Sequence, residues 1–149
     1  MTTRRAVLAA LALLATRCSS SPPPPAVLTL TVIGGPDQNP DASGRPAPVA
    51  VRLFELNGTA KFERADVFAL TEREQQTLGG DSQGSEEFVL TPGETRNITR
   101  ELKKGVQFVG VAVLFRDIDQ SRWRAEAPVA ASGPSKLTLK INGTNATLS

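Results

Sequence analysis

The 149-residue sequence contains no histidine, no tyrosine and a single cysteine, Cys18. Without histidine the chain cannot form a Ser-His-Asp or Cys-His catalytic group, or a zinc or iron site with histidine ligands. One cysteine also excludes a Cys-x-x-Cys redox pair and a cysteine cluster. Most common catalytic chemistry is therefore excluded, although paired carboxylates for glycoside hydrolysis are not. We expect that the protein is not an enzyme and carries no metal or other cofactor.

The sequence also has few aromatic residues, 5% of the total, and little excess charge, with a formal net charge of +2. Three of its 17 basic residues (Arg4, Arg5 and Arg17) and none of its 15 acidic residues precede Cys18, so the remainder carries 14 positive and 15 negative charges, a net charge of −1. Nucleic-acid binding needs a basic surface in the folded part. We expect no nucleic-acid partner.

Long hydrophobic runs are absent apart from Ala6–Ala15, which follows Arg4 and Arg5. At about 1.5 Å per residue this run spans only half of a ~30 Å hydrocarbon layer, and a short apolar run after basic residues is typical of an export signal. No later segment reaches 18 consecutive apolar residues. We interpret residues 1–17 as a signal peptide.

Cys18 ends this leader and is followed by three serines and four prolines, up to Pro25. The arrangement resembles a bacterial lipoprotein signal, in which the cysteine becomes the lipidated first residue, although Ala15 and Arg17 depart from the usual residues before it. Ser19 is the residue type associated with sorting to the outer membrane. Residues 18–25 would then be a lipidated cysteine with a semi-rigid spacer of roughly 20 Å. A secreted protein with a free thiol is the alternative.

From Ala26 onward, apolar and polar residues mainly alternate, which is typical of strands. The run 108–115 is apolar on both faces, which predicts a central strand. A Thr91–Glu94 turn and a two-residue turn at Asn142–Gly143 are expected to join neighbouring strands. About eight short strands result, at 27–33, 49–56, 88–90, 98–102, 108–115, around Trp123, 137–141 and 144–148.

Only residues 61–79 show helical spacing, with Phe62, Ala65 and Ala69 on one side. Thr71 and Glu74 fit a capping box for a second helical turn, which Gly79 would end. Strand, strand, helix and then six strands cannot form a parallel βαβ sheet, so residues 26–149 are predicted to be an all-β sandwich with a helical insertion after the second strand. The predicted core includes Val51, Leu53, Phe62, Val111, Val113, Phe115, Leu137 and Leu139.

Three weaker patterns have ordinary explanations. Asp117–Ser121 starts like a calcium loop but lacks the required glycine and glutamate, so we interpret it as a turn. Asn-x-Thr triplets at 57, 97, 142 and 145 would accept glycans in a eukaryotic secretory pathway, but a bacterial-type leader favours their interpretation as turn and strand-edge residues. Trp123, between Arg122 and Arg124, is interpreted as a core residue with solvated flanking charges, the alternative being a cation–π contact.

The segment Pro36–Pro48 joins the first two predicted strands with thirteen residues, where a hairpin needs two to five. Three further prolines, Pro40, Pro46 and Pro48, reduce the entropy lost on ordering, which suits a preorganised binding loop. A tolerated surface loop explains the length equally well.

Several segments taken in order resemble the outer-membrane lipoprotein of the type VI secretion system, the TssJ family. The resemblance runs from the leader to about Arg124 and departs at Phe54, Phe115, Val67 and Thr71 and at the Arg17 position. The segments that carry it are Asn39–Leu56, Phe62–Leu70, Leu90–Glu94, Val109–Asp117 and Trp123–Arg124.

The resemblance implies a transthyretin-like two-sheet β-sandwich, tethered to the outer membrane and facing the periplasm. It also implies a structural adaptor, whose loop between the first two strands binds the periplasmic C-terminal domain of the inner-membrane protein TssM and so fixes the membrane complex to the outer membrane. The expected contact residues are Asn39, Asp41, Ser43, Gly44, Arg45 and Pro46. The alternative is a periplasmic sandwich lipoprotein that binds a small ligand or carbohydrate in an aromatic-lined pocket. No small-molecule substrate is expected of the adaptor.

Overall fold

The structure is a computed structural model that describes residues 21–149. The predicted signal peptide and Cys18 lie outside the described residues. Residues 21–25 are exposed and form neither helix nor strand. Eight strands follow: β1 (Ala26–Gly34), β2 (Val49–Leu56), β3 (Ser82–Leu90), β4 (Thr95–Glu101), β5 (Phe108–Val113), β6 (Arg124–Pro128), β7 (Gly133–Asn142) and β8 (Asn145–Leu148).

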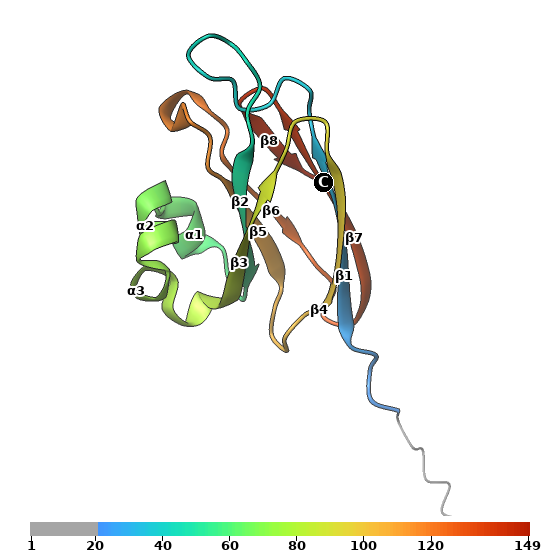
Figure 1. Cartoon of the computed structure of the whole chain (residues 1–149). Coiled ribbons are helices and arrows are strands. Elements are labelled where there is room, and N and C mark those ends of the chain that lie inside the picture. The colour runs from blue at the N-terminus through green and yellow to red at the C-terminus, as the bar shows by residue number, and fades with distance from the viewer. Residues whose placement is uncertain (1–20) are drawn as a thin grey trace, which may run out of the picture.

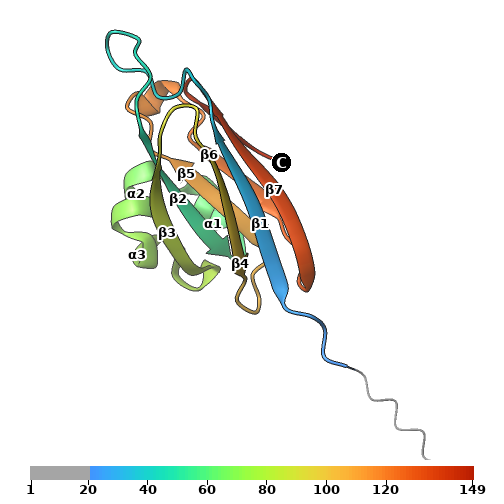
Figure 2. The same ribbon diagram turned by 45° about the vertical axis from the view of Figure 1, so that its right-hand side comes forward.

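The strands form two four-stranded sheets that pack face to face (Figure 1). One sheet has the order β4-β1-β7-β8 and the other β3-β2-β5-β6. All neighbours are antiparallel except β1 and β7, which are parallel. The turn after β3 carries the chain from one sheet to the other, as Figure 2 shows. The predicted sandwich of eight strands is confirmed.

Short helices cover the outer face of the β2–β5 sheet only (Figure 1). They are α1 (Ala60–Arg64), α2 (Val67–Glu72) and α3 (Glu74–Leu78), followed by a 3-10 turn at Gly79–Asp81. This cover explains why β5 is apolar on both faces. Val111 points into the sandwich, whereas Ala112 packs against the helices.

The interior therefore consists of two cores, one between the sheets and one under the helices. Seven of the eight predicted core residues are buried, and Leu137 is only partly buried. Phe62 lies in the helical core, where its ring meets the edge of Phe54 with centroids 5.3 Å apart. Because both cores are built from residues of the 26–149 segment, we expect this part of the chain to fold on its own.

Several predicted strand boundaries are wrong: β4 and β7 start three and four residues earlier than expected, and β5 ends two residues earlier. β3 starts at Ser82, six residues earlier than expected, because its polar first half pairs with β2 along a sheet edge. Asn142 belongs to β7, so the two residues between β7 and β8 are Gly143 and Thr144, with Gly143 at φ +56°.

Trp123 precedes β6 instead of lying in a strand. It is half-buried and packs against both cores. The guanidinium carbon of Arg124 lies 4.3 Å from the centroid of its ring, and Arg124 also donates a hydrogen bond to the backbone carbonyl of Phe62. The prediction that both flanking charges are solvated is therefore wrong for Arg124, which makes the cation–π contact and whose hydrogen bond to Phe62 joins β6 to α1.

The predicted capping box is also wrong. Asp66 begins α2 instead, and its carboxylate accepts a 2.8 Å hydrogen bond from the backbone N–H of Ala69. Thr71 lies inside α2 and donates its hydroxyl to the carbonyl of Val67. The predicted end at Gly79 is confirmed, with this residue at φ +51° after α3.

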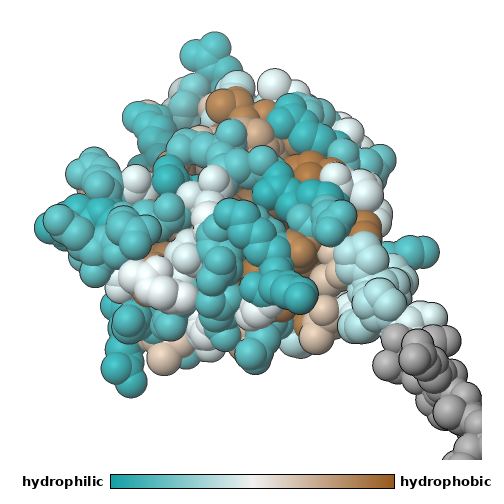
Figure 3. Space-filling view, turned by 90° about the horizontal axis from the view of Figure 1, so that it is seen from below, coloured by the Kyte–Doolittle hydropathy of each residue, from teal (hydrophilic) through white to brown (hydrophobic). Residues whose placement is uncertain are grey.

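The predicted turn at Asp117–Ser121 contains the 3-10 turn Ile118–Gln120. Within residues 21–149 no group of three acidic, cysteine or histidine side chains is placed to hold a metal ion. No helix of this part of the chain is long and apolar enough to cross a membrane. Figure 3 views the end of the domain from which residues 21–25 leave, where hydrophilic residues dominate the surface.

Candidate partner-binding loop

The loop between β1 and β2 extends from one end of the sandwich, and residues 21–25 leave from the other (Figures 1 and 2). Since β1 and β2 belong to different sheets, the loop bridges the two layers. Its length, unusual for a hairpin, is partly explained by this crossing. The hydrogen bonds divide it into a buried base and an exposed tip.

Gln38 and Asn39 form the buried base. The Gln38 side chain is fully buried, and its Nε2 donates to the carbonyl oxygens of Leu90 at 2.8 Å and Ala47 at 3.2 Å. These bonds hold the start of the loop against the end of β3 and against the last residues of the loop before β2.

Asn39 is only 7% exposed and has φ +45°. Its backbone N–H donates to the carbonyl of Gly143, and its Nδ2 donates to that of Pro48, each at 2.8 Å. Its Oδ1 accepts from the backbone N–H of Arg116, also at 2.8 Å. Asn39, predicted as a contact residue, therefore has its amide committed to bonds inside the protein.

Asp41 organises the tip. One carboxylate oxygen accepts from the Ser43 backbone N–H at 2.9 Å, the Ser43 hydroxyl at 2.7 Å and the Arg45 backbone N–H at 2.9 Å. The hydroxyl hydrogen bond from Ser43 is the main cause that lowers the pKa of Asp41. The backbone N–H of Asp41 also donates to the carbonyl of Arg45 at 2.8 Å, and Gly44 turns the chain at φ +81°.

The tip presents the other predicted residues to solvent. The Arg45 side chain is 81% exposed, and its Nε donates to the Ser43 hydroxyl at 3.1 Å. Ser43, Gly44 and Pro46 are exposed as well, and Asp41 is half-buried. The structure thus brings five of the six predicted residues together on one ordered tip and places Asn39 beneath them.

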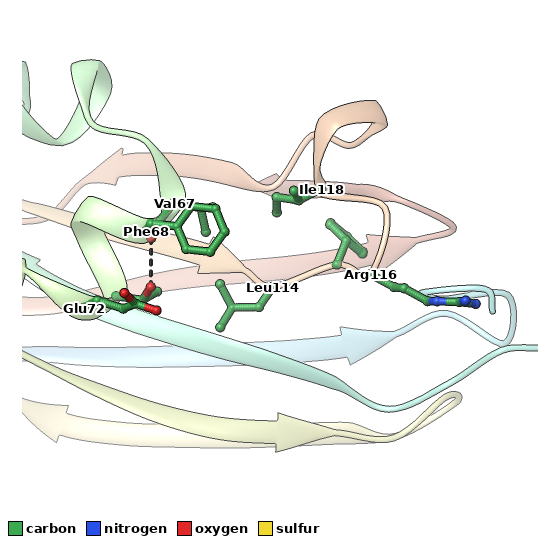
Figure 4. Close-up of a pocket in the computed structure, with 8 residues that line it drawn as sticks. Val67, Phe68, Glu72, Leu114, Arg116 and Ile118 are labelled. Atoms are coloured by element: carbon green, nitrogen blue, oxygen red, sulfur yellow. Dashed lines mark hydrogen bonds between the residues drawn. The ribbon is translucent and has the colours of Figure 1, made fainter. Parts of the chain in front are cut away.

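Arg116 is a neighbour of this tip that the sequence did not indicate. It lines a polar hollow of about 300 Å³ together with Pro40, Asp41, Ala42 and Asp117. Arg116 also reaches a second, more apolar hollow of about 370 Å³ beside α2, whose walls include Phe68, Leu114 and Ile118. Figure 4 shows the Phe68 ring over this second hollow, which we call the α2 groove. Because Arg116 and Phe68 lie far from the loop in sequence, only the fold reveals this surface.

Comparison with known families decides what kind of protein carries this loop. The model of the type VI secretion lipoprotein family, whose members include VasD, EvfM and TssJ, matches residues 26–144. The chain belongs to the TssJ family. This family consists of structural type VI secretion lipoproteins and is not a known class of enzyme. A comparison with curated proteins found no match.

Solved structures support this membership. The crystal structure of the type VI lipoprotein TssJ1 from Pseudomonas aeruginosa is 36% identical, with a TM-score of 0.82 over 85% of this chain and 96% of that chain. Serratia marcescens Lip, a membrane-bound component of the type VI secretion system, has the same fold at 23% identity, with a TM-score of 0.75 over 84% and 96% of the two chains.

A third match comes from a structure described as the type VI protein TssM C-terminal domain from EAEC. The matching chain is 27% identical to this TssJ family member, and the TM-score is 0.71 over 83% of this chain and 97% of that chain.

Proposed function

We propose that this TssJ family member is an adaptor that holds the type VI membrane complex to the outer membrane from its periplasmic side. Residues 1–17 are the signal peptide, Cys18 carries the lipid, residues 18–25 are the tether, and residues 26–149 are the adaptor domain. The tip at residues 41–46 binds the periplasmic C-terminal domain of TssM. Neither catalysis nor a cofactor has a part in this role.

The observation that carries the proposal is the preorganised tip. The Asp41 carboxylate fixes Ser43 and Arg45 before any partner arrives, so little conformational entropy remains to be lost on binding. Arg45 offers a planar set of N–H donors that suits a carboxylate or backbone carbonyls. The tip also extends from the end of the domain opposite the tether, which leaves it accessible when the other end faces a membrane (Figure 1).

One structure supports the binding of TssM. It is described as the TssM C-terminal domain from EAEC, and it contains a chain that is similar to this protein. The membrane anchor is supported by the description of Serratia marcescens Lip as membrane-bound. A single acyl chain holds a protein only weakly on a membrane, so stable anchoring requires the several chains of a bacterial lipoprotein.

Replacement of residues 41–45 by a Gly-Ser-Gly link tests the tip and keeps the base residues Gln38 and Asn39. We expect at least about tenfold weaker binding of the purified TssM periplasmic domain by calorimetry, because a few central residues dominate such interfaces. The melting temperature should stay nearly unchanged. As a matched control, Lys103 and Lys104 at the tether end are replaced by Gly-Ser. Unchanged affinity of the tip variant would refute the proposed contact.

Mass spectrometry of the mature N-terminus tests the anchor. A lipidated Cys18 as the first residue is expected. A precursor that retains Arg17, or an unmodified Cys18 thiol, would contradict both the anchor and the proposed boundaries.

The alternative function, binding of a small ligand or carbohydrate, has less support. It predicts a concave site lined by stacking aromatic rings. In the α2 groove Phe68 offers an exposed ring, whereas Phe115 is only 4% exposed. The hollow next to the tether is formed mainly by prolines, lysines and small residues and has no aromatic lining.

A further inference from the structure

The α2 groove contains an aromatic side chain that the fold does not bury. Phe68 is 62% exposed, although Leu70, two residues later in α2, is fully buried in the helical core. In residues 21–149, Val89 is the other large apolar side chain with comparable exposure, at 54%. A single exposed apolar side chain is common on protein surfaces, so Phe68 indicates an interaction site only together with the hollows beside it.

The surface is hollow on both sides of Phe68. The α2 groove, of about 370 Å³, has apolar walls from Val67, Leu114 and Ile118. On the other side, Phe68 and Trp123 line a hollow of about 430 Å³ whose walls also carry charged side chains, those of Arg64, Asp66, Asp119 and Arg124. The ring is therefore a ridge between two hollows, of which the α2 groove is the one with mainly apolar walls.

Arg116 connects the α2 groove to the partner-binding tip, because it lines both the groove and the hollow beside Asp41. Figure 4 shows its side chain directed away from Phe68. Within the described residues its guanidinium makes no hydrogen bond or ion pair. Asp41 lines the same hollow and already accepts hydrogen bonds from Ser43 and Arg45, and the Arg116 charge contributes to lowering the pKa of its carboxyl.

We propose that the partner surface continues from the tip across Arg116 into the α2 groove. There it receives an apolar side chain of the TssM periplasmic domain, with a carboxylate of the same segment against the Arg116 guanidinium. The apolar walls select the first group, and the unpaired cation at the rim selects the second. This inference rests on the proposed function, because it extends the same interface.

Two substitutions test it by calorimetric titration with the TssM periplasmic domain. Phe68→Ser removes the ridge and Arg116→Glu reverses the rim charge, and each should weaken binding about tenfold. Both side chains are exposed, and the Arg116 backbone bond to Asn39 remains, so the melting temperatures should stay unchanged. The matched controls are Val89→Ser, for an exposed apolar residue on β3, and Lys104→Glu, for a basic residue at the tether end.

If Phe68→Ser and Arg116→Glu bind TssM with full affinity while the tip variant binds weakly, the groove is not part of the interface, and the proposed loop contact still stands. Full affinity of all three variants would overturn the proposed function itself. If Val89→Ser and Lys104→Glu weaken binding as much as Phe68→Ser and Arg116→Glu, the groove assignment is also wrong, because the loss of affinity would then not depend on the groove.

A spectroscopic test locates the contact directly. The chain from residue 21 onward has no cysteine, so an environment-sensitive fluorophore can be placed on Glu72→Cys in the groove or on Val89→Cys as the control. Saturating partner should shift the emission of the Glu72 label to the blue and leave that of the Val89 label unchanged. An unchanged Glu72 label would overturn the proposal.

Discussion

The side-chain oxygen of Asn39 accepts a 2.8 Å hydrogen bond from the backbone N–H of Arg116, 77 positions later in the chain. The bond joins the base of the β1–β2 loop to the segment after β5. The other two bonds of Asn39 reach Gly143 and Pro48, so one residue ties together three connections at the same end of the sandwich. Asn39 thereby positions the tip relative to Arg116.

Asn39→Ala should lower the free energy of unfolding by about 2 kcal/mol, because it leaves buried groups without partners and puts alanine at a positive φ. Urea unfolding measures the change. Asn39→Gly removes the same side-chain bonds without the backbone strain, so it separates the two causes. If both variants unfold at the same urea concentration as the unaltered protein, Asn39 does not have this structural role.

Gly110 is required by the close approach of α1 to β5. A Cβ atom there would lie 2.8 Å from Cζ of Phe62 and 2.9 Å from Cδ1 of Leu56. We expect Gly110→Ala to cost about 1–3 kcal/mol through overpacking, measured by chemical unfolding. Gly80→Ala, where the added methyl group meets no atom within 4 Å, is the control. Equal stability of the two variants would show that the helical core adjusts freely.

Asp41→Ala tests the preorganisation of the tip. The substitution removes the acceptor of three hydrogen bonds from an exposed turn, so the melting temperature should change by no more than a few degrees. Binding of TssM should weaken several-fold, because the tip must then be ordered on binding. Calorimetry and thermal melts report the two quantities separately. A large drop in the melting temperature would instead identify Asp41 as a structural residue.

Glu126 should make stability depend on pH. Burial raises its pKa to about 7, and a hydrogen bond to the Glu63 carboxylate adds to the effect. The folded protein therefore binds more protons than the unfolded chain between the usual pKa, 4.5, and about 7, so stability falls as pH rises through this window. The pKa of Glu63 is lowered from its usual value of 4.5, so Glu63 affects stability only below about pH 4.5 and does not contribute to the slope between 4.5 and about 7.

Glu126→Gln should remove this slope and stabilise the domain by about 1 kcal/mol at roughly pH 8, a value reduced for the partial exposure of the site. Unfolding curves collected between about pH 5 and pH 8 measure it. An identical slope in the variant would show that another group titrates in this range.

The strands were predictable wherever one hydrophobic face had to meet the core. β1 and β2 show this alternation, and the continuous apolar run of β5 correctly indicated a strand covered on both sides. The first half of β3 lacks such a signal, because Ser82–Glu87 lie on an edge strand. Its inward Glu86 is instead neutralised by Arg100 of β4, in an ion pair between distant segments.

The capping box failed because two local signals competed. Thr71 and Glu74 have the required spacing, but Asp66 had already begun a helix that contains Thr71. Once Thr71 is inside α2, its hydroxyl bonds the preceding turn and cannot cap the next helix.

The position of the loop followed from its length, but the roles of its residues did not. Asn39 and Arg45 are both polar residues in a proline-rich segment, and only one of them is buried. Burial of Asn39 depends on Gly143 and Arg116, which the fold brings close from remote positions. The α2 groove could not be predicted for the same reason, because its lining residues come from segments that only the fold brings together.

β1 carries a mechanical consequence for the proposed adaptor. The tether enters at Ala26 and the loop leaves after Gly34, so a pull between membrane and partner would act along the axis of one strand. β1 pairs with β4 on one flank and with β7 on the other. Such a load would shear both ladders at once instead of peeling their hydrogen bonds apart one by one. Resistance to traction would then reside in this strand and in the rate at which both ladders rupture together.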